Sequence, residues 1–206
     1  MSKHRSRIAI ILLSLILVNV LPVEAQTVFG DENSPERGYG LRFVVAELNC
    51  ENLFDCEDDS LKADEAFLPS GINRWTPKRY WKKLNNIARE IISLGEGDDG
   101  TAAIPDLVGL CEVENDSVLF DLTHRSLLRN AKYEYLITNS PDLRGIDVAL
   151  LYSPLTFGIL DTYSIRIPSQ KDMRPTRDIL YVKGRAASSD TLHVFVVQSL
   201  TITLSM

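Results

Sequence analysis

The hydrophobic pattern after residue 40 predicts seven strands and two helices. Apolar or alternating runs of strand length occupy residues 41–49, 105–115, 133–138, 147–152, 157–167, 179–183 and 192–197. Several of the later runs are joined by short turns, which favours antiparallel pairing between neighbours. The order strand, helix, strand, helix and then a series of strands predicts an α/β sandwich with helices on its outer faces.

The first predicted helix has clear ends and an unusual charge pattern. Thr76 is a good N-cap, Pro77 fits the first helical position and Gly95 ends the helix. Its apolar stripe consists of Tyr80, Leu84, Ile87, Ile91 and Leu94. Its first two turns, where the helix dipole disfavours cations, carry Lys78, Arg79, Lys82 and Lys83. This charge pattern indicates either an anion site or, more simply, a solvated face.

A second amphipathic helix follows the strand at residues 105–115. Asn115 or Asp116 is its expected N-cap. Its predicted core side consists of Val118, Leu119, Leu122 and Leu127.

The strand at residues 105–115 carries a carboxylate in apolar surroundings. Pro105 opens it, as proline is tolerated at the first residue of a strand, and the apolar run that follows is typical of a strand covered on both faces. Glu112 lies at its carboxyl end. Burying an unpaired charge is costly, so a buried Glu112 would need an arginine or a metal ion beside it. The alternative is a half-exposed Glu112 where the strand ends.

Composition and charge narrow the range of functions. The chain has 206 residues, with 45% hydrophobic and 24% charged residues, which is typical of one globular domain. Its net charge is −6. An acidic chain does not hold nucleic acid by general electrostatics, so a phosphate substrate would need a local basic group or a bound cation.

Residues 1–25 resemble a secretory signal peptide. Basic residues precede an apolar run from Ile8 to Val23, and Val23-Glu24-Ala25 fits a cleavage site before Gln26. We therefore expect an exported protein, periplasmic or extracellular, with no membrane attachment after cleavage. The alternative is an uncleaved membrane anchor, although the run is short for a span. Residues 26–40 are polar and are expected to form a flexible leader.

Cysteines and acidic residues offer weaker candidates for chemistry. Cys50, Cys56 and Cys111 are interpreted mainly as small buried residues, with a Cys50–Cys56 disulfide as the alternative. An acidic loop contains Glu57, Asp58, Asp59, Asp64 and Glu65. We interpret it as a solvated loop in preference to a second metal site.

Four segments combine apolar strands with polar residues at their ends. They are residues 49–55 (NCENLFD), 106–115 (DLVGLCEVEN), 144–152 (RGIDVALLY) and 174–180 (RPTRDIL). Together, in this order, they resemble the endonuclease/exonuclease/phosphatase family, whose fold is that of pancreatic deoxyribonuclease. The resemblance covers residues 41–198, the N-terminal portion of such a domain, and residues 199–206 have no family character.

The resemblance implies a fold, an activity and a metal. The fold is a four-layer α/β sandwich, of which this chain would form part, with mixed, mostly antiparallel sheets flanked by helices. The activity is Mg²⁺-dependent hydrolysis of phosphate esters, with Mn²⁺ as an alternative ion. Asn49 and Glu112 match the family's catalytic, metal-binding positions. Mg²⁺ prefers oxygen ligands and needs only one or two protein carboxylates, which also accounts for Glu112 on an apolar strand.

Three further residues are candidates for contact with the substrate phosphate: Arg144, Asp147 and Arg177. Arginine is suited to bidentate phosphate binding. The alternative is structural ion pairing, of Arg144 with Asp147 or of Arg177 with Asp178. Arg174, beside Arg177, shares this interpretation.

The sequence departs from the family pattern near its end. Where the family has a strand-end His, this chain has Gln198, and neither a Gly-Asp-x-Asn segment nor a terminal Asp-His pair follows. His124 and His193 match no catalytic position. We therefore expect a chain truncated by a frameshift or premature stop and impaired as an enzyme. The alternative is a non-catalytic fragment or binding module. The phosphate-ester substrate, nucleic acid or otherwise, and the oligomeric state stay open.

Overall fold

The computed structural model describes residues 8–15, 42–96, 103–168 and 175–198. The predicted leader at residues 26–40, the tail at residues 199–206 and Arg174 lie outside these ranges. Across the described ranges, no helix combines the length and apolar character needed to cross a membrane.

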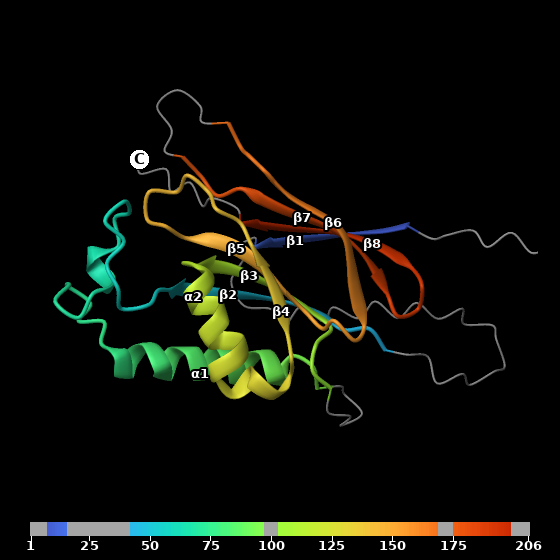
Figure 1. The fold of residues 1–206 in the computed structure, drawn as a ribbon, viewed down its shortest axis with the longest axis horizontal. Helices are drawn as coiled ribbons and strands as arrows, with labels where there is room; N and C mark the ends of the chain where they lie inside the picture. The colour runs from blue at the N-terminus through green and yellow to red at the C-terminus, as the bar shows by residue number, and fades with distance from the viewer. Residues whose placement is uncertain (1–7, 16–41, 97–102, 169–174, 199–206) are drawn as a thin grey trace, which may run out of the picture.

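Two four-stranded sheets form the body of the molecule (Figure 1). The first sheet has the order β2-β3-β5-β4, made by Val45–Leu53, Leu107–Val113, Asp147–Tyr152 and Glu134–Ile137. Within it only β2 and β3 run parallel, and the other two pairs are antiparallel. The carboxyl ends of β2 and β3 therefore lie at the same edge of this sheet.

The second sheet has the order β1-β8-β7-β6. Its strands are Ile8–Leu15, Thr191–Gln198, Ile179–Ala186 and Phe157–Ile165. β6, β7 and β8 form an antiparallel meander, while β1 pairs with β8 in parallel. β1 belongs to the apolar run predicted as a signal peptide, and removal of residues 1–25 stays a prediction.

Helices cover the outer face of the first sheet. α1 (Pro77–Ser93) and α2 (Asp116–Phe120) pack there, and α2 continues through a π-helical turn, η2 (Asp121–Arg125), and a 3-10 turn, η3 (Leu127–Asn130). A short 3-10 turn, η1 (Glu65–Phe67), precedes α1. The core beneath them combines the predicted helical stripes with strand residues. Its largest members include Leu53, Trp75, Tyr80, Leu84, Ile91, Leu110, Leu119, Leu122 and Tyr133.

A second core fills the space between the sheets. It consists mainly of Leu107, Cys111, Val148 and Leu150 on one side and Phe157, Leu180, Val182, Leu192, Val194 and Val196 on the other. The apolar run around Glu112 is therefore buried on both faces, because β3 lies between the helices and the second sheet. The result is an α/β fold with mixed, mostly antiparallel sheets, as predicted. The described residues hold three of the four layers that the resemblance implies.

Element boundaries confirm most of the predicted pattern. Thr76 occupies the N-cap of α1 without a side-chain cap bond, and Pro77 begins the helix. Asn115 is the N-cap of α2, and its side chain accepts a hydrogen bond from the backbone of Val118. The predicted strand at residues 41–49 is displaced, since β2 begins at Val45 and ends at Leu53. Two core assignments are wrong, because Leu94 and Leu127 are 39% and 40% exposed.

Candidate active site at the ends of β2, β3 and β8

Asn49 is the last residue of β2 before its pairing with β3 becomes irregular, and Glu112 lies near the carboxyl end of β3. The two strands stay in register up to the pair Asn49–Cys111, one residue before Glu112. The backbone N–H of Asn52 donates to Oε2 of Glu112 at 3.0 Å. Asn49 Oδ1 accepts a hydrogen bond from the backbone N–H of Glu51 at 2.8 Å. The turn that follows Asn49 therefore anchors the Glu112 carboxylate.

A bulge aims Glu112 out of the regular strand. Its neighbours Cys111 and Val113 belong to cores on opposite faces of the sheet, although residues two apart in a regular strand share a face. Both pairings of β3 are irregular between these two residues, and Glu112 has φ of +61°. Such a left-handed conformation costs a non-glycine residue about 1–3 kcal/mol. Surrounding packing thus holds Glu112 in a strained conformation beside a polar edge.

Gln198, at the end of β8, brings the second sheet to Glu112. Its Nε2 donates to Oε1 of Glu112 at 2.9 Å. Its own Oε1 is buried and has no hydrogen-bond partner among the described residues. Position 198 was identified from the sequence only as the place of an absent His, and its contact with Glu112 was missed. The two residues are far apart in the chain and on different sheets, so no local pattern signals this contact.

These residues fit a hard divalent cation held by oxygen atoms. Each Glu112 oxygen accepts one hydrogen bond and keeps acceptor capacity for a second partner. The unpartnered Gln198 Oε1 and the amide of Asn49 add oxygen donors at the same edge. The described residues contain no group of three or more His, Cys, Asp or Glu side chains suited to a metal. Mg²⁺ tolerates this sparse set because it keeps several waters.

The two arginines predicted to contact phosphate share one carboxylate. Asp142, 6% exposed, has one oxygen 3.7 Å from Nε of Arg144 and the other 3.6 Å from Nε of Arg177. Arg177 is 5% exposed, and its Nε has no hydrogen-bond partner in the described part of the chain. Burial lowers the pKa of Arg177, while Asp142 opposes this shift and Glu112 lies near enough to contribute. Arg177 is therefore a buried cation that lies beside Asp142 and whose Nε has no hydrogen-bond partner among the described residues.

The alternative ion pairs predicted from the sequence are wrong in their partners. Asp178 pairs with Arg166, at 2.7 Å, and not with Arg177. Asp147 is 4% exposed and accepts hydrogen bonds from Oγ1 of Thr138 at 2.5 Å and from the backbone N–H of Ser140 at 3.0 Å. Asp147 thus fixes the turn after β4. Closeness in the sequence suggested these ion pairs, but the strands direct the side chains of Asp147 and Asp178 toward other partners.

The three cysteines are free thiols, so the alternative Cys50–Cys56 disulfide is absent. Cys50 and Cys111 are buried, as the main interpretation predicted, whereas Cys56 is only partly buried. Burial raises the pKa of Cys111 to about 12, and the nearby carboxylates of Glu47 and Glu112 add to this shift. A thiol with so high a pKa stays protonated and is a poor nucleophile.

The acidic loop before η1 is held by local structure. Asp64, 1% exposed, accepts a hydrogen bond from the backbone of Asp59. Glu114 accepts one from the backbone of Asp55 at 2.7 Å, and burial raises the pKa of Glu114 to about 8, with nearby carboxylates adding to the shift. These contacts order the loop and leave it without a described cluster of metal ligands. The buried Asp64 departs from the interpretation of this segment as a solvated loop, and the alternative of a second metal site stays a prediction.

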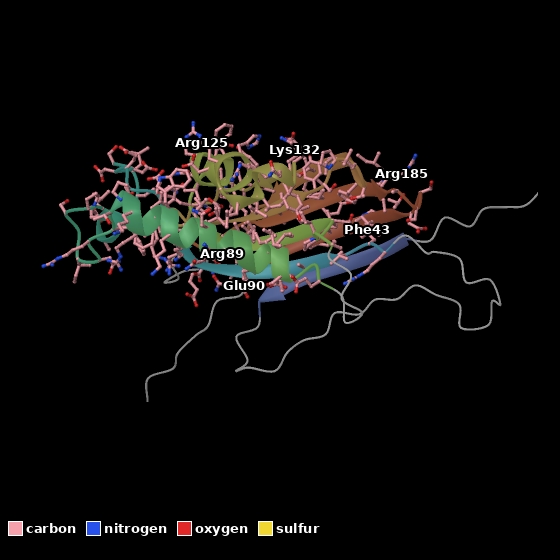
Figure 2. All side chains as sticks on the ribbon, turned by 90° about the horizontal axis from the view of Figure 1, so that it is seen from below. Phe43, Arg89, Glu90, Arg125, Lys132 and Arg185 are labelled. Carbon is pink, nitrogen blue, oxygen red and sulfur yellow. The ribbon has the colours of Figure 1, made fainter. Side chains whose placement is uncertain are left out.

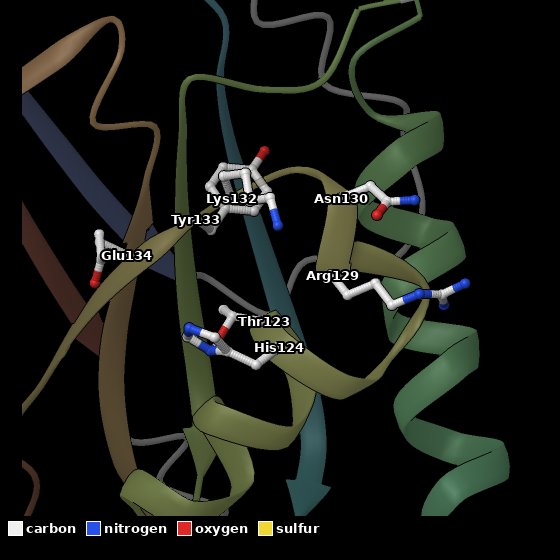
Figure 3. Close-up of a pocket in the computed structure, with 7 residues that line it drawn as sticks. All are labelled: Thr123, His124, Arg129, Asn130, Lys132, Tyr133 and Glu134. Atoms are coloured by element: carbon white, nitrogen blue, oxygen red, sulfur yellow. The ribbon is translucent and has the colours of Figure 1, made fainter.

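A pocket of about 260 Å³ lies away from the strand ends (Figure 3). It is formed around η2, η3 and the start of β4, and its lining includes His124, Lys132 and Glu134. His124 contacts Oγ1 of Thr123 through Nδ1 at 2.8 Å. Neither Asn49 nor Glu112 lines this pocket, so it forms no part of the candidate site.

Comparison with solved structures finds similar but longer proteins. A humanized TDP2 from D. rerio is 17% identical, with 74% of this chain and 45% of that chain covered and a TM-score of 0.43. An endonuclease/exonuclease/phosphatase from Bacteroides vulgatus is 14% identical, with 73% and 49% covered and a TM-score of 0.44. ANGEL2, described as a 2′,3′-cyclic phosphatase, is 18% identical, with 74% and 40% covered and a TM-score of 0.45. This chain spans at most about half the length of these proteins.

A family model identifies most of the chain directly. No curated protein matches this chain. The model for the endonuclease/exonuclease/phosphatase family matches residues 44–201, which include β2 to β8, both helices and the strand ends carrying Asn49, Glu112 and Gln198. The chain therefore belongs to the endonuclease/exonuclease/phosphatase family.

Proposed function

We propose that this chain is a metal-dependent hydrolase of phosphate esters, of the nuclease or phosphodiesterase type, with its site at Glu112 and Asn49. Family membership supports hydrolysis of phosphate esters in general terms. Mg²⁺ is the proposed ion and Mn²⁺ the alternative. When bound, the ion would neutralise the phosphate and stabilise charge on the leaving oxygen. Arg177 and Arg144 are proposed to assist in binding the phosphate.

One observation carries this proposal: Glu112 is anchored through both oxygens, from two different sheets, at the edge where Asn49 lies. The left-handed backbone of Glu112, which costs about 1–3 kcal/mol, is of the kind that clusters at active sites. Holding a reactive group in one orientation is what phosphate chemistry requires of a protein.

The test is a phosphodiesterase assay on the purified chain, with a plasmid and a chromogenic phosphodiester as substrates. Each is measured in Mg²⁺, in Mn²⁺ and in a chelator. Glu112→Gln is the matched variant, since it keeps the size of the side chain and removes its charge. Activity that requires both the metal and Glu112 supports the proposal. Activity that survives Glu112→Gln unchanged rejects this site.

A second candidate function is a non-catalytic binding module, and Gln198 is the observation that favours it. Its carboxamide cannot exchange a proton as a histidine does, and one acid–base group contributes about 10²–10⁴-fold to a rate. We therefore propose that turnover is slow compared with ordinary enzymes. A rate in the ordinary range for hydrolases would exclude both the impairment and the binding-module alternative.

We also propose export of the protein, on the strength of the basic and apolar residues at its start. Expression of the full chain in a bacterial host, followed by fractionation and N-terminal sequencing, tests this. A mature chain that begins at Gln26 outside the cytoplasm supports export. A full-length chain in the cytoplasmic fraction contradicts it.

A further inference from the structure

A groove of about 600 Å³ runs between α1 and the edge strand β2, and it reaches Asn49. We propose that this groove binds the phosphodiester backbone of a single-stranded nucleic acid, next to the phosphate that reacts at Glu112. The inference rests on the proposed function and names its substrate class. It is carried by the lining residues Arg79, Lys82, Lys83 and Trp75, together with Asn49 and Glu51.

Lys83 links the groove to the candidate site. Its Nζ donates to the backbone carbonyls of Glu51 and Asn52, the latter at 3.1 Å. The N–H of Asn52 in turn donates to Glu112. The ammonium charge of Lys83 therefore sits on the turn that orients the carboxylate.

Trp75 orders the cations at the start of α1. Cζ of Arg79 lies 5.5 Å from the centre of its ring, and Nζ of Lys83 lies 5.6 Å from it. Arg79 also donates to the backbone carbonyls of Asn73 and Arg74. Trp75 itself is only 8% exposed, and its indole N–H donates a hydrogen bond to the backbone carbonyl of Phe54. It leaves little surface for stacking with a base, so recognition here would be of backbone charge and not of sequence.

Lys82 is the cation most available to a ligand. It is exposed, and it has no hydrogen bond or ion pair within the described ranges. The first turn of α1 contains no acidic residue, and the helix N-terminus adds positive potential there.

Two carboxylates also line the groove, and their positions define where an anion would bind. Glu51 is at the β2 side, where Lys83 contacts its backbone carbonyl. Glu90 lies eight residues beyond Lys82 on the same helix, about 12 Å along its axis. The anion-binding part is therefore the end formed by Arg79, Lys82 and Lys83. A chain of charge −6 that groups cations at this end is suited to binding a polyanion there.

The test measures binding apart from catalysis. A short fluorescently labelled oligothymidine is titrated with the purified chain in a chelator, and anisotropy is followed at several salt concentrations. For single strands the logarithm of the affinity falls with the logarithm of salt at a slope of about −0.7 per phosphate contacted. Lys82→Gln keeps helix propensity and removes one charge. We expect it to weaken binding several-fold at low salt and to reduce the slope by about 0.7.

Arg185→Gln is the matched control, because it removes one charge from the end of β7, away from α1 (Figure 2). It should leave both affinity and slope as in the wild type. Equal effects of the two variants, or no binding by the wild type, overturn the inference. Hydrolysis of the chromogenic diester by the wild type in Mg²⁺ reports on the proposed function independently. A chain that hydrolyses the diester but does not bind the oligonucleotide therefore rejects the groove alone.

Discussion

Gly184 is required for the packing between the two sheets, and replacing it with alanine should destabilise the protein. A Cβ atom at this position would lie within 2.6 Å of three ring atoms of Phe157. Phe157 is 1% exposed and belongs to the core between the sheets. Carbon atoms are at their best separation at about 3.5–4.0 Å, so the nearest part of the ring would have to move by about 1.5–2 Å in a packed core.

The expected cost follows from this displacement. Overpacking a well-packed core costs about 1–3 kcal/mol. For a domain of this size each kcal/mol lowers the melting temperature by about 2–4 °C, so Gly184→Ala should lower it by roughly 2–12 °C. Urea denaturation with tryptophan fluorescence gives the free energy of unfolding directly. Its midpoint should fall with little change in slope.

Gly158 supplies a control of opposite sign. It lies on the neighbouring strand β6, and a Cβ added there would meet no atom within 4 Å. Gly158→Ala should therefore leave stability unchanged or raise it by about 0.4–1 kcal/mol, because alanine restricts the unfolded chain. Adding Phe157→Leu to Gly184→Ala should cost less than the sum of the two single changes. If Gly184→Ala is as stable as Gly158→Ala, the described packing of β7 on Phe157 is wrong.

Two further changes test the polar interior. Burial raises the pKa of Asp147 above its ordinary value, although its hydrogen bonds oppose this. The folded state thus binds this proton more tightly than the unfolded state, and the free energy of unfolding should fall as pH rises above about 3.8. Asp147→Asn keeps an acceptor oxygen for both hydrogen bonds and should remove the pH dependence of stability that Asp147 contributes. An unchanged pH profile of stability in the variant would show that Asp147 does not have a raised pKa. Gln198→Ala removes a bond to Glu112 and should weaken Mg²⁺ affinity by about 10–100-fold, measured as the metal-dependent rise in melting temperature. An equal rise in the variant and the wild type would show that Gln198 does not position Glu112.

The sequence predicted the fold correctly wherever the structure of an element depends on the residues of that segment alone. The stripe from Tyr80 to Ile91 and the apolar run before Glu112 are buried as predicted, because helical and strand periodicities are properties of a single segment. The displaced start of β2 and the exposed Leu127 were missed. Pairing with β3 sets the limits of β2, and the π-helical turn at residues 121–125 rotates the residues that follow it, so that Leu128 is buried in place of Leu127.

The part of the candidate site that lies on the adjacent strands β2 and β3 could be predicted from the sequence. Glu112 stood out because it follows an apolar run, Asn49 was assigned through the family resemblance, and the parallel pairing of β2 and β3 places the two residues near each other. The contact with Gln198 and the sharing of Asp142 by two arginines depend on how the sheets stack and how loops turn. These arrangements depend on contacts between residues far apart in the chain, which periodicity does not encode.

The left-handed backbone at Glu112 means that thermal stability and the candidate site favour different residues at this position. Glycine adopts φ near +60° without steric penalty, and asparagine does so more readily than glutamate. A library of this chain screened only for survival at high temperature should therefore enrich glycine or asparagine at position 112. Such survivors would fold better than the parent and would have lost the carboxylate. Any attempt to stabilise this scaffold for use must hold position 112 fixed and seek its gains elsewhere.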